Sequence, residues 1–240
     1  SGFCSGKHSP CIFLNVEQDL WVVVHGGDFT LLGGEDELDW FKGKICAVLQ
    51  VKFRARLIRG SSDAVCILNR VLQVNSEGIE YEADQRHAEL ISRDVGLQTS
   101  SNPVSTPGVQ AQQVTSKEEA LHDSMYRAIV ARGNYLSQDR PDVQYTTKEL
   151  SRTALKPEVE SHVRAKRLGR YLVGAPRIVM TYGVQDVPDV LTIWVDTDFA
   201  GCQITRKSTS GGVAMLGKHC LKTWSCTQEV VALSSGEAEL

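Results

Sequence analysis

Residues 191–226 read "LTIWVDTDFAGCQITRKSTSGGVAMLGKHCLKTWSC", and this stretch decides the architecture of the C-terminal region. Its runs of β-branched and aromatic residues predict three strands, at 191–195, 209–216 and 219–226. In the following "SSGEAEL" (234–240), Ser234 and Glu237 have the spacing of a capping box and predict a helix, with Glu239 in its first turns. Because a helix that has only just begun cannot bury its face, we expect this β-β-β-α order to be cut off in mid-domain.

The N-terminal third is also rich in predicted strands. "LWVVVH" (20–25) and "FTLLG" (29–33) are apolar runs on either side of a Gly-Gly turn, a pattern typical of a β-hairpin. "DELDWFKGKICAVL" (36–49) follows the periodicity of a helix, weakened by Gly43. "VKFRARLIRG" (51–60) alternates between cationic and apolar residues, which predicts a further strand.

Lys52, Arg54 and Arg56 would share one face of that last strand and form a basic patch. The patch has two interpretations, an ordinary solvated face or a surface that follows the phosphates of nucleic acid. The whole chain carries a net charge of −3, so any attraction to nucleic acid has to come from such local patches.

The middle of the chain reads as helical around a linker. "EADQRHAELISRDVGL" (82–97) predicts a helix, and the Ser, Thr, Pro and Gly of 99–116 predict a linker. Ser116 and Glu119 have capping-box spacing at the start of the next helix, and a turn at Pro141 introduces another. The core-facing stripe of the helix after Ser116 would comprise Leu121, Met125, Ala128, Ile129, Tyr135 and Leu136.

Residues 158–173, "EVESHVRAKRLGRYLV", predict an amphipathic helix with two distinct faces. Its core-facing side would comprise Ala165, Leu168 and Leu172. Its opposite side would comprise Lys166, Arg167 and Arg170. This second basic patch has the same two interpretations as the first, solvated surface or nucleic-acid contact.

The composition excludes several classes of protein. Hydrophobic residues at 42% and charged residues at 23% of 240 residues are ordinary for a soluble globular chain of one or two domains. No run approaches the ~18 apolar residues of a membrane span, and the first twenty residues lack the apolar segment typical of a signal peptide. Seven cysteines without a C-x-x-C pair argue against structural zinc and favour free thiols in a reducing, intracellular compartment, cytoplasmic or nuclear.

Acidic residues near the C-terminus are the candidates for metal chemistry. Asp196 and Asp198 follow a predicted strand, and Glu237 and Glu239 lie in a predicted helix. Two-metal nucleases and polymerases need three or four converging carboxylates, so this set also has a simpler interpretation: Asp198 begins a turn and Glu237 caps the helix. No P-loop, dinucleotide fingerprint or nucleophile elbow is present, and no small-molecule substrate is evident.

Several stretches resemble one family in their sequence motifs and in the order of those motifs along the chain. "WVDTDFAGCQITRKSTSGGVAMLG" and "TWSCTQEVVALSSGEAEL" resemble the ribonuclease H segment of copia-type (Ty1/copia) retrotransposon Pol polyproteins. "YRAIVARGNYLSQDRPDVQYTTKELSR" and "HVRAKRLGRYLVG" resemble their connecting region. "EADQRHAELI…VSTPG" resembles the end of their reverse transcriptase. The resemblance runs, with gaps, from about residue 20 to Leu240.

For the polymerase, the resemblance implies a damaged metal site. In the family, two adjacent aspartates follow a His-Gly pair in the hairpin and bind the catalytic Mg²⁺ ions. Here His25 and Gly26 are in place, Gly27 replaces the first aspartate, and Asp28 alone remains. Glycine offers no oxygen ligand. We therefore expect no polymerase activity from these residues.

For the ribonuclease H segment, the resemblance implies half of a metal site. Asp196 matches the family's first metal-binding aspartate and Glu239 its helix glutamate, while Glu237 matches a structural acid. Leu240 stands where the family usually has tyrosine, and the family's remaining aspartates would follow Leu240. Two of four ligands are too few to hold two Mg²⁺ ions for in-line hydrolysis.

The resemblance implies an α/β (α+β) fold in three parts. These are a reverse transcriptase palm and thumb remnant at 1–110, a helical connection at 111–188 and a truncated ribonuclease H-like sheet at 189–240. We expect a transposable-element fragment related to RNA-directed DNA polymerase and ribonuclease H, with incomplete catalytic residues. Two alternatives stay open. One is a non-catalytic module that binds an RNA–DNA hybrid or template-primer through the two basic patches, and the other is a window on a longer, active nuclease.

Overall fold

The computed structural model describes residues 2–61, 63–109 and 122–240. The chain folds as two compact units, Ser1–Arg56 and Leu57–Leu240. The described residues form three small antiparallel sheets and six helices, which agrees with the expected α+β class. The division at 110 and 188 into polymerase, connection and nuclease parts stays a prediction.

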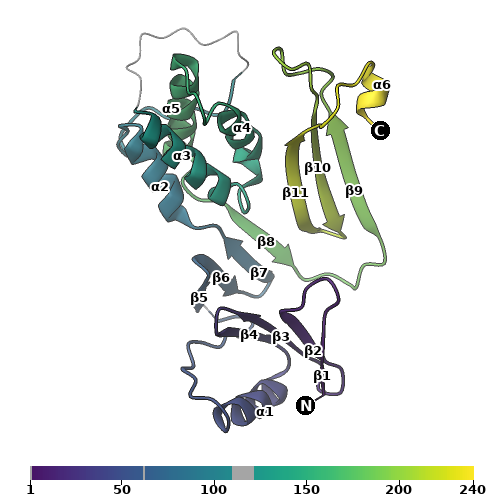
Figure 1. The fold of residues 1–240 in the computed structure, drawn as a ribbon. Coiled ribbons are helices and arrows are strands. Elements are labelled where there is room, and N and C mark those ends of the chain that lie inside the picture. The colour runs from purple at the N-terminus through teal and green to yellow at the C-terminus, as the bar shows by residue number, and fades with distance from the viewer. Residues whose placement is uncertain (1, 62, 110–121) are drawn as a thin grey trace. The chain divides into compact units, whose positions relative to one another are not determined.

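The first unit is an antiparallel meander followed by one helix (Figure 1). Its strands are β1 (Phe3–Ser5), β2 (Ile12–Asn15), β3 (Leu20–His25) and β4 (Asp28–Leu32). The predicted hairpin at 20–33 is confirmed as β3 and β4, and the predicted helix is confirmed as α1 (Glu35–Cys46). Strands β1 and β2 were not predicted individually. They are short and have no strict alternation of apolar and polar residues.

The predicted strand at 51–60 is wrong. Residues 50–58 have no regular secondary structure and pair with no other strand. The guanidinium of Arg56 instead bonds to the carboxylate of Asp39 on α1. The Lys42 ammonium lies 4.5 Å from the centre of the Phe53 ring. Without a neighbouring strand to complete the backbone hydrogen bonds, alternation alone does not form a strand.

The second unit begins with a four-stranded sheet in the order β5-β6-β7-β8. These strands, of which none was predicted, are β5 (Ala64–Ile67), β6 (Arg70–Val74), β7 (Gly78–Glu82) and β8 (Val179–Gly183). Strand β8 pairs with β7 although almost a hundred residues separate them, and the helices lie in between. Gly78 is required at this junction, because a Cβ there would lie 2.1 Å from the carbonyl oxygen of Tyr182.

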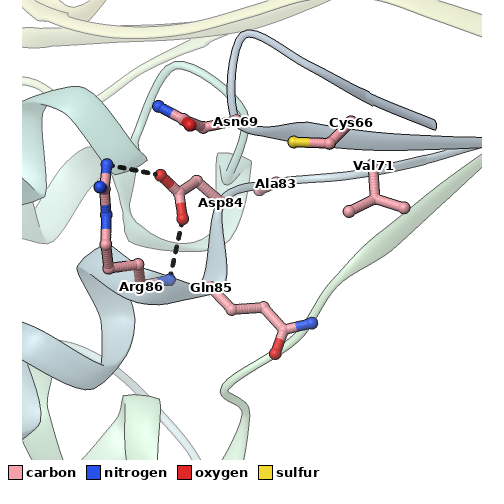
Figure 2. Close-up of a pocket in the computed structure, with 7 residues that line it drawn as sticks. All are labelled: Cys66, Asn69, Val71, Ala83, Asp84, Gln85 and Arg86. Carbon is pink, nitrogen blue, oxygen red and sulfur yellow. Dashed lines mark hydrogen bonds and ion pairs between the residues drawn. The ribbon is translucent and has the colours of Figure 1, made fainter. Parts of the chain in front are cut away.

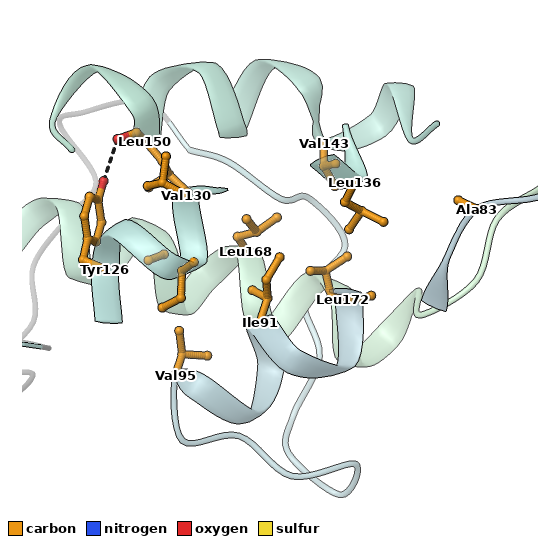
Figure 3. Close-up of a cluster of buried hydrophobic side chains, with 13 residues drawn as sticks. Ala83, Ile91, Val95, Tyr126, Val130, Leu136, Val143, Leu150, Leu168 and Leu172 are labelled. Atoms are coloured by element: carbon orange, nitrogen blue, oxygen red, sulfur yellow. Dashed lines mark hydrogen bonds between the residues drawn. The ribbon is translucent and has the colours of Figure 1, made fainter. Parts of the chain in front are cut away.

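The helices between β7 and β8 contain the main hydrophobic core (Figure 3). They are α2 (Gln85–Asp94), α3 (Asp123–Leu136), α4 (Pro141–Arg152) and α5 (Val159–Gly174). The predicted core residues Ala165, Leu168 and Leu172 of α5 are confirmed, each at most 1% exposed. The helices predicted at 82–97, after Pro141 and at 158–173 are likewise confirmed as α2, α4 and α5.

The predicted stripe of α3 is partly wrong. Ile129 and Leu136 are buried as expected, but Met125 is 38% exposed and Tyr126 occupies the core in its place. The Tyr126 hydroxyl donates to the carbonyl of Leu150 at 2.8 Å, so this buried polar group has a hydrogen-bond partner. The predicted capping box at Ser116 and Glu119, together with Leu121, lies outside the described residues.

Residues 98–109, called the strap here, have no helix or strand and cross α5. Pro103 packs on Gly174, where an added Cβ would lie 2.7 Å from the proline ring. Gly108 packs on Thr146 of α4, where an added Cβ would lie 2.7 Å from the threonine Oγ1. The described part of the predicted linker is therefore not a free tether but a segment packed on two helices.

The last part of the second unit is a three-stranded sheet in the order β11-β10-β9. The three strands predicted from the opening stretch are confirmed as β9 (Leu191–Thr197), β10 (Thr209–Leu216) and β11 (His219–Thr227). The short helix α6 (Ser235–Ala238) follows, also as predicted. Trp224 on β11 lies over Gly212 on β10, where an added Cβ would lie 2.2 Å from the indole ring.

Candidate metal centre and nucleic-acid interface

Asp196 lies in the C-terminal half of β9 and is exposed. Its Oδ1 accepts a hydrogen bond from the backbone N–H of Thr197 at 2.9 Å. The carboxylate makes no ion pair with the described residues, so its remaining oxygen positions face solvent. Asp196 therefore has the accessibility that a metal ligand needs.

Helix α6 lies near the end of the sheet at which β9 terminates (Figure 1). Glu239 follows α6 directly, and Asp196 is the last residue but one of β9. A chain of side-chain hydrogen bonds connects the two places. The Thr197 hydroxyl lies 3.4 Å from that of Ser210, and the Gln228 amide donates to Ser210 at 2.9 Å and to the carbonyl of Ala238 at 2.6 Å. Gln228 thus fixes α6 to the ends of the strands, with Glu239 exposed beside it.

The other two acids of this region have structural roles. The Ser234 hydroxyl accepts from the backbone N–H of Glu237 at 3.1 Å, and the Glu237 carboxylate accepts from that of Leu233 at 2.7 Å. These bonds satisfy donors at the start of α6. Asp198 accepts from the backbone N–H of Thr209 at 2.6 Å and closes the loop between β9 and β10. The interpretation of both acids as cap and turn residues agrees with this geometry.

The donor set does not complete a metal site. Carboxylate oxygens are the ligands that Mg²⁺ prefers, so the type of donor fits. However, over residues 2–61, 63–109 and 122–240 no three His, Cys, Asp or Glu side chains converge closely enough to hold a metal ion. Asp196 and Glu239 therefore belong to no such group, and no two-metal hydrolysis can be derived from them.

Asp28 lies in the first unit, at the start of β4 and opposite His25 in the hairpin register. Gly26 and Gly27 form the turn with φ of 57° and 93°, conformations that favour glycine over residues with a Cβ. The Asp28 carboxylate is 64% exposed, and its nearest cation is Arg54 at 3.8 Å. The hairpin therefore presents a single acid beside a guanidinium.

The first basic patch loses the strand on which it was predicted. Residues 51–58 form no strand, so strand alternation does not place Lys52, Arg54 and Arg56 on one face. Arg54 lies near Asp28 and Arg56 bonds to Asp39, whose pKa is lowered chiefly by that hydrogen bond. Two of the three cations are thus paired with acids of the first unit.

The second basic patch is a continuous helix face that the strap partly covers. Arg167 donates to the Thr106 hydroxyl at 2.7 Å, and Arg170 donates from Nε to the carbonyl of Asn102 at 2.9 Å. Lys166 lies on the same helix and also takes part in an interaction. Among the described residues, neither Arg167 nor Arg170 forms an ion pair with a carboxylate. Within the described ranges, both guanidinium groups donate to neutral oxygens.

A small pocket of about 280 Å³ lies beside the start of α2 (Figure 2). Its main charged groups are Asp84 and Arg86, which bond to each other. The Asp84 carboxylate accepts from the backbone N–H of Arg86 at 2.9 Å and from its guanidinium at 3.2 Å. The first of these bonds caps α2, so the two charged groups of the pocket are used in local structure.

Sequence reasoning missed Cys202, in the loop between β9 and β10. Partial burial raises the pKa of its thiol, but hydrogen bonds from Thr205, the backbone of Ile204 and the Arg152 guanidinium outweigh it and bring the pKa to about 7. A lone cysteine in a loop gives no signal in a sequence. The Arg152 side chain comes from α4, fifty residues away, and only the fold brings the two together.

Comparison with known proteins gives relatives that include two transposon Pol polyproteins. The "Retrovirus-related Pol polyprotein from transposon RE1" of Arabidopsis thaliana is 34% identical over 146 residues, 58% of this chain. The corresponding polyprotein from transposon RE2 of the same plant is 32% identical over 169 residues, 68% of this chain. The chain is a homologue of copia-type transposon Pol polyproteins. It spans only 10% and 11% of the lengths of those two relatives.

A third relative is an uncharacterized mitochondrial protein of Arabidopsis thaliana, 28% identical over 158 residues, which are 64% of each chain. No protein-family model and no solved structure matches the chain. No helix in the described ranges of this transposon Pol homologue is long and apolar enough to cross a bilayer. The relation therefore rests on sequence and supports the resemblance that the motifs indicated.

Proposed function

We propose that β9–β11 and α6 are a ribonuclease H-like element of a transposon Pol polyprotein, and that this chain neither cleaves RNA–DNA hybrids nor extends primers. The observation that carries the proposal is that Asp196 near the end of β9 and Glu239 after α6 belong to no group of three or more metal-ligating side chains in the described part of the chain. Homology to the Pol polyproteins of RE1 and RE2 supports the assignment.

The polymerase half of the proposal rests on the hairpin at Asp28. A polymerase metal site needs carboxylates that bridge two Mg²⁺ ions, and the turn supplies glycine at 26 and 27. The one acid present lies 3.8 Å from the Arg54 guanidinium, which competes with a cation for its oxygens. The described residues of the first unit therefore offer Mg²⁺ no complete set of ligands.

The test is an assay of hybrid cleavage and primer extension with Mg²⁺, on the full chain and on Asp196→Asn. We expect no activity above that of the variant in either assay. Hybrid cleavage that Asp196→Asn abolishes would contradict the inactivity and at the same time support the ribonuclease H assignment. Cleavage that the variant retains comes from a contaminating nuclease and leaves the proposal standing.

A second candidate function is non-catalytic binding of nucleic acid through α5. Arg167 and Arg170 favour it, because they lie one turn apart and have no carboxylate partner in the described chain. Binding of a labelled RNA–DNA hybrid should weaken steeply with salt, and Arg167→Gln/Arg170→Gln should weaken it further at every salt concentration. Arg54→Gln is the matched control and should change little. A flat salt response would exclude this function.

A further inference from the structure

We propose that Thr106 in the strap is a phosphorylation site, and that a phosphate on its Oγ1 locks the strap to α5 through Arg167 and Arg170. The inference goes beyond the proposed function and does not depend on it, since it uses neither metal ligands nor nucleic acid. It rests on the contacts between residues 98–109 and α5.

Thr106 is accessible to a modifying enzyme. It is exposed and lies in a segment without helix or strand, and protein kinases bind their substrates as extended segments. Pro107 follows it directly, and a Thr-Pro pair is the minimal recognition unit of proline-directed protein kinases. The neighbouring Ser105 is followed by Thr106 and lacks this feature. The strap thus contains a single hydroxyl group followed by proline.

The reaction is an ordinary phosphoryl transfer from ATP. The Thr106 Oγ1 attacks the γ-phosphorus, the bond from that phosphorus to the β–γ bridging oxygen breaks, and ADP leaves. The hydroxyl proton passes to the catalytic base of the kinase. The product is a phosphate monoester with a charge of about −1.5 to −2 at pH 7.

Arg167 is already placed to receive that phosphate. One of its terminal nitrogens donates to the Thr106 hydroxyl at 2.7 Å. Its Nε is buried and has no hydrogen-bond partner among the described residues. An unsatisfied buried donor is costly, and a phosphate oxygen offers the missing acceptor. Arg–phosphate pairs are frequently bidentate, and this geometry would use both Nε and the terminal nitrogen of the Arg167 guanidinium.

Arg170 and the two ends of the strap make further contacts that hold the strap on the helices. Arg170 holds the carbonyl of Asn102 at 2.9 Å, one helical turn from Arg167. Pro103 and Gly108 already pack on α5 and α4, on either side of Thr106. Because the strap is held at both ends, little further ordering opposes the new bonds. Neither arginine pairs with a carboxylate in the described chain that would compete with the phosphate.

The experiment is to incubate the full chain with a proline-directed kinase and ATP, map the phosphate by mass spectrometry, and measure backbone hydrogen exchange of residues 98–109. We expect phosphate on Thr106 in the native sequence and in Ser105→Ala, but not in Thr106→Val. Exchange in the strap should slow about tenfold on phosphorylation, as expected for a charge-assisted hydrogen bond. Arg167→Gln/Arg170→Gln should still accept phosphate and show no slowing.

Two results would overturn the inference. One is phosphate found elsewhere in the chain while Thr106 stays unmodified, since the site would then be inaccessible. The other is stoichiometric phosphate on Thr106 with exchange of the strap unchanged or faster, since the arginines would then not hold the phosphate. Both results are independent of any nuclease or polymerase assay.

Discussion

The helices α2–α5 and the sheet β9–β11 belong to the same unit but differ in what they bury. Core side chains such as Ile91, Ile129 and Leu168 are at most 1% exposed. On β9 the apolar side chains of Ile193, Trp194 and Val195 are 56–65% exposed, and one edge of the strand is unpaired. Since burial of apolar area is the main stabilising contribution, the helices hold the unit together and the sheet depends on them.

The sheet is attached to the helices by a few polar contacts. The Gln144 amide on α4 donates to the Thr223 hydroxyl of β11 at 2.9 Å. Lys148 donates to the Thr209 hydroxyl of β10 at 2.7 Å. Such bonds each contribute about 0.5–1.5 kcal/mol, far less than a packed core. We therefore expect the sheet to open in local fluctuations that leave the helices intact.

The largest difference should come from matched leucine substitutions. Leu168→Ala removes a side chain that is 1% exposed and should lower the free energy of unfolding by about 2–5 kcal/mol. Leu191→Ala on β9 removes one that is 54% exposed and should cost less than about 1 kcal/mol. Urea unfolding followed by circular dichroism measures both. Equal costs would mean that the sheet is as well packed as the helices.

A glycine pair on β10 offers a test confined to the sheet. Gly212→Val would place its Cβ within 2.2 Å of the Trp224 ring, and we expect a local cost of about 1–3 kcal/mol. At Gly211 the nearest atoms are 3.9 Å away, so Gly211→Val is the control and should be tolerated. Hydrogen exchange should accelerate in β10 and β11 but not in α5. Acceleration in both places would show that the two regions unfold together.

The sequence predicted the local elements better than the long-range ones. The β9–β11 order, the Gly-Gly hairpin and the faces of α5 follow from alternation, turn residues and helical periodicity, which are local signals. The β7–β8 pair joins residues about a hundred apart and has no local signal. The stretch at 51–60 shows the converse, a strand pattern without a partner strand.

The residue roles in the candidate site also divide into those that local sequence predicts and those that only the fold reveals. The capping role of Ser234 followed from its spacing to Glu237 and is confirmed, whereas the Glu237 carboxylate accepts from the backbone N–H of Leu233 and not from that of Ser234. The metal roles of Asp28, Asp196 and Glu239 came from family resemblance and stay predictions. The contacts of Arg167 with the strap and of Arg152 with Cys202 could not be read from the sequence, because tertiary packing alone brings these residues together.

Substitutions at helix caps should show a smaller difference in stability between the helical core and the region of the sheet. The Asp84 carboxylate caps α2 beside the core and accepts from the backbone N–H of Arg86 at 2.9 Å. Asp84→Ala should lower the free energy of unfolding by about 1 kcal/mol. Ser234→Ala removes the equivalent bond from the four-residue helix α6 and should leave global unfolding unchanged within about 0.5 kcal/mol. Chemical denaturation of both variants measures this difference, and a reversed order would contradict the dominance of the helical core.

The smallest expected effect concerns Cys202, where the β9–β10 loop meets α4. Because its pKa is lowered to about 7, its alkylation by iodoacetamide should rise through pH 7 and level off above it. The lowered pKa also makes stability depend on pH, because the folded state favours the thiolate. The stabilisation from the Cys202 thiolate is fully present above the unfolded pKa of ~8.5 and is lost as pH falls through 7.

The contact of Arg152 with Cys202 joins α4 to the loop between β9 and β10, so the titration of Cys202 tests whether the helices contact the sheet here. Arg152→Gln removes a guanidinium hydrogen bond that favours the thiolate and should move the midpoint of alkylation upward. Mass spectrometry of a chain with Cys202 as the sole cysteine, against the same chain with Arg152→Gln, measures the shift. An unchanged midpoint would mean that the loop alone determines the pKa of the Cys202 thiol. It would also mean that Arg152 of α4 does not contact this end of the sheet. An upward shift would show that α4 reaches the sheet here, in addition to the Gln144 and Lys148 contacts.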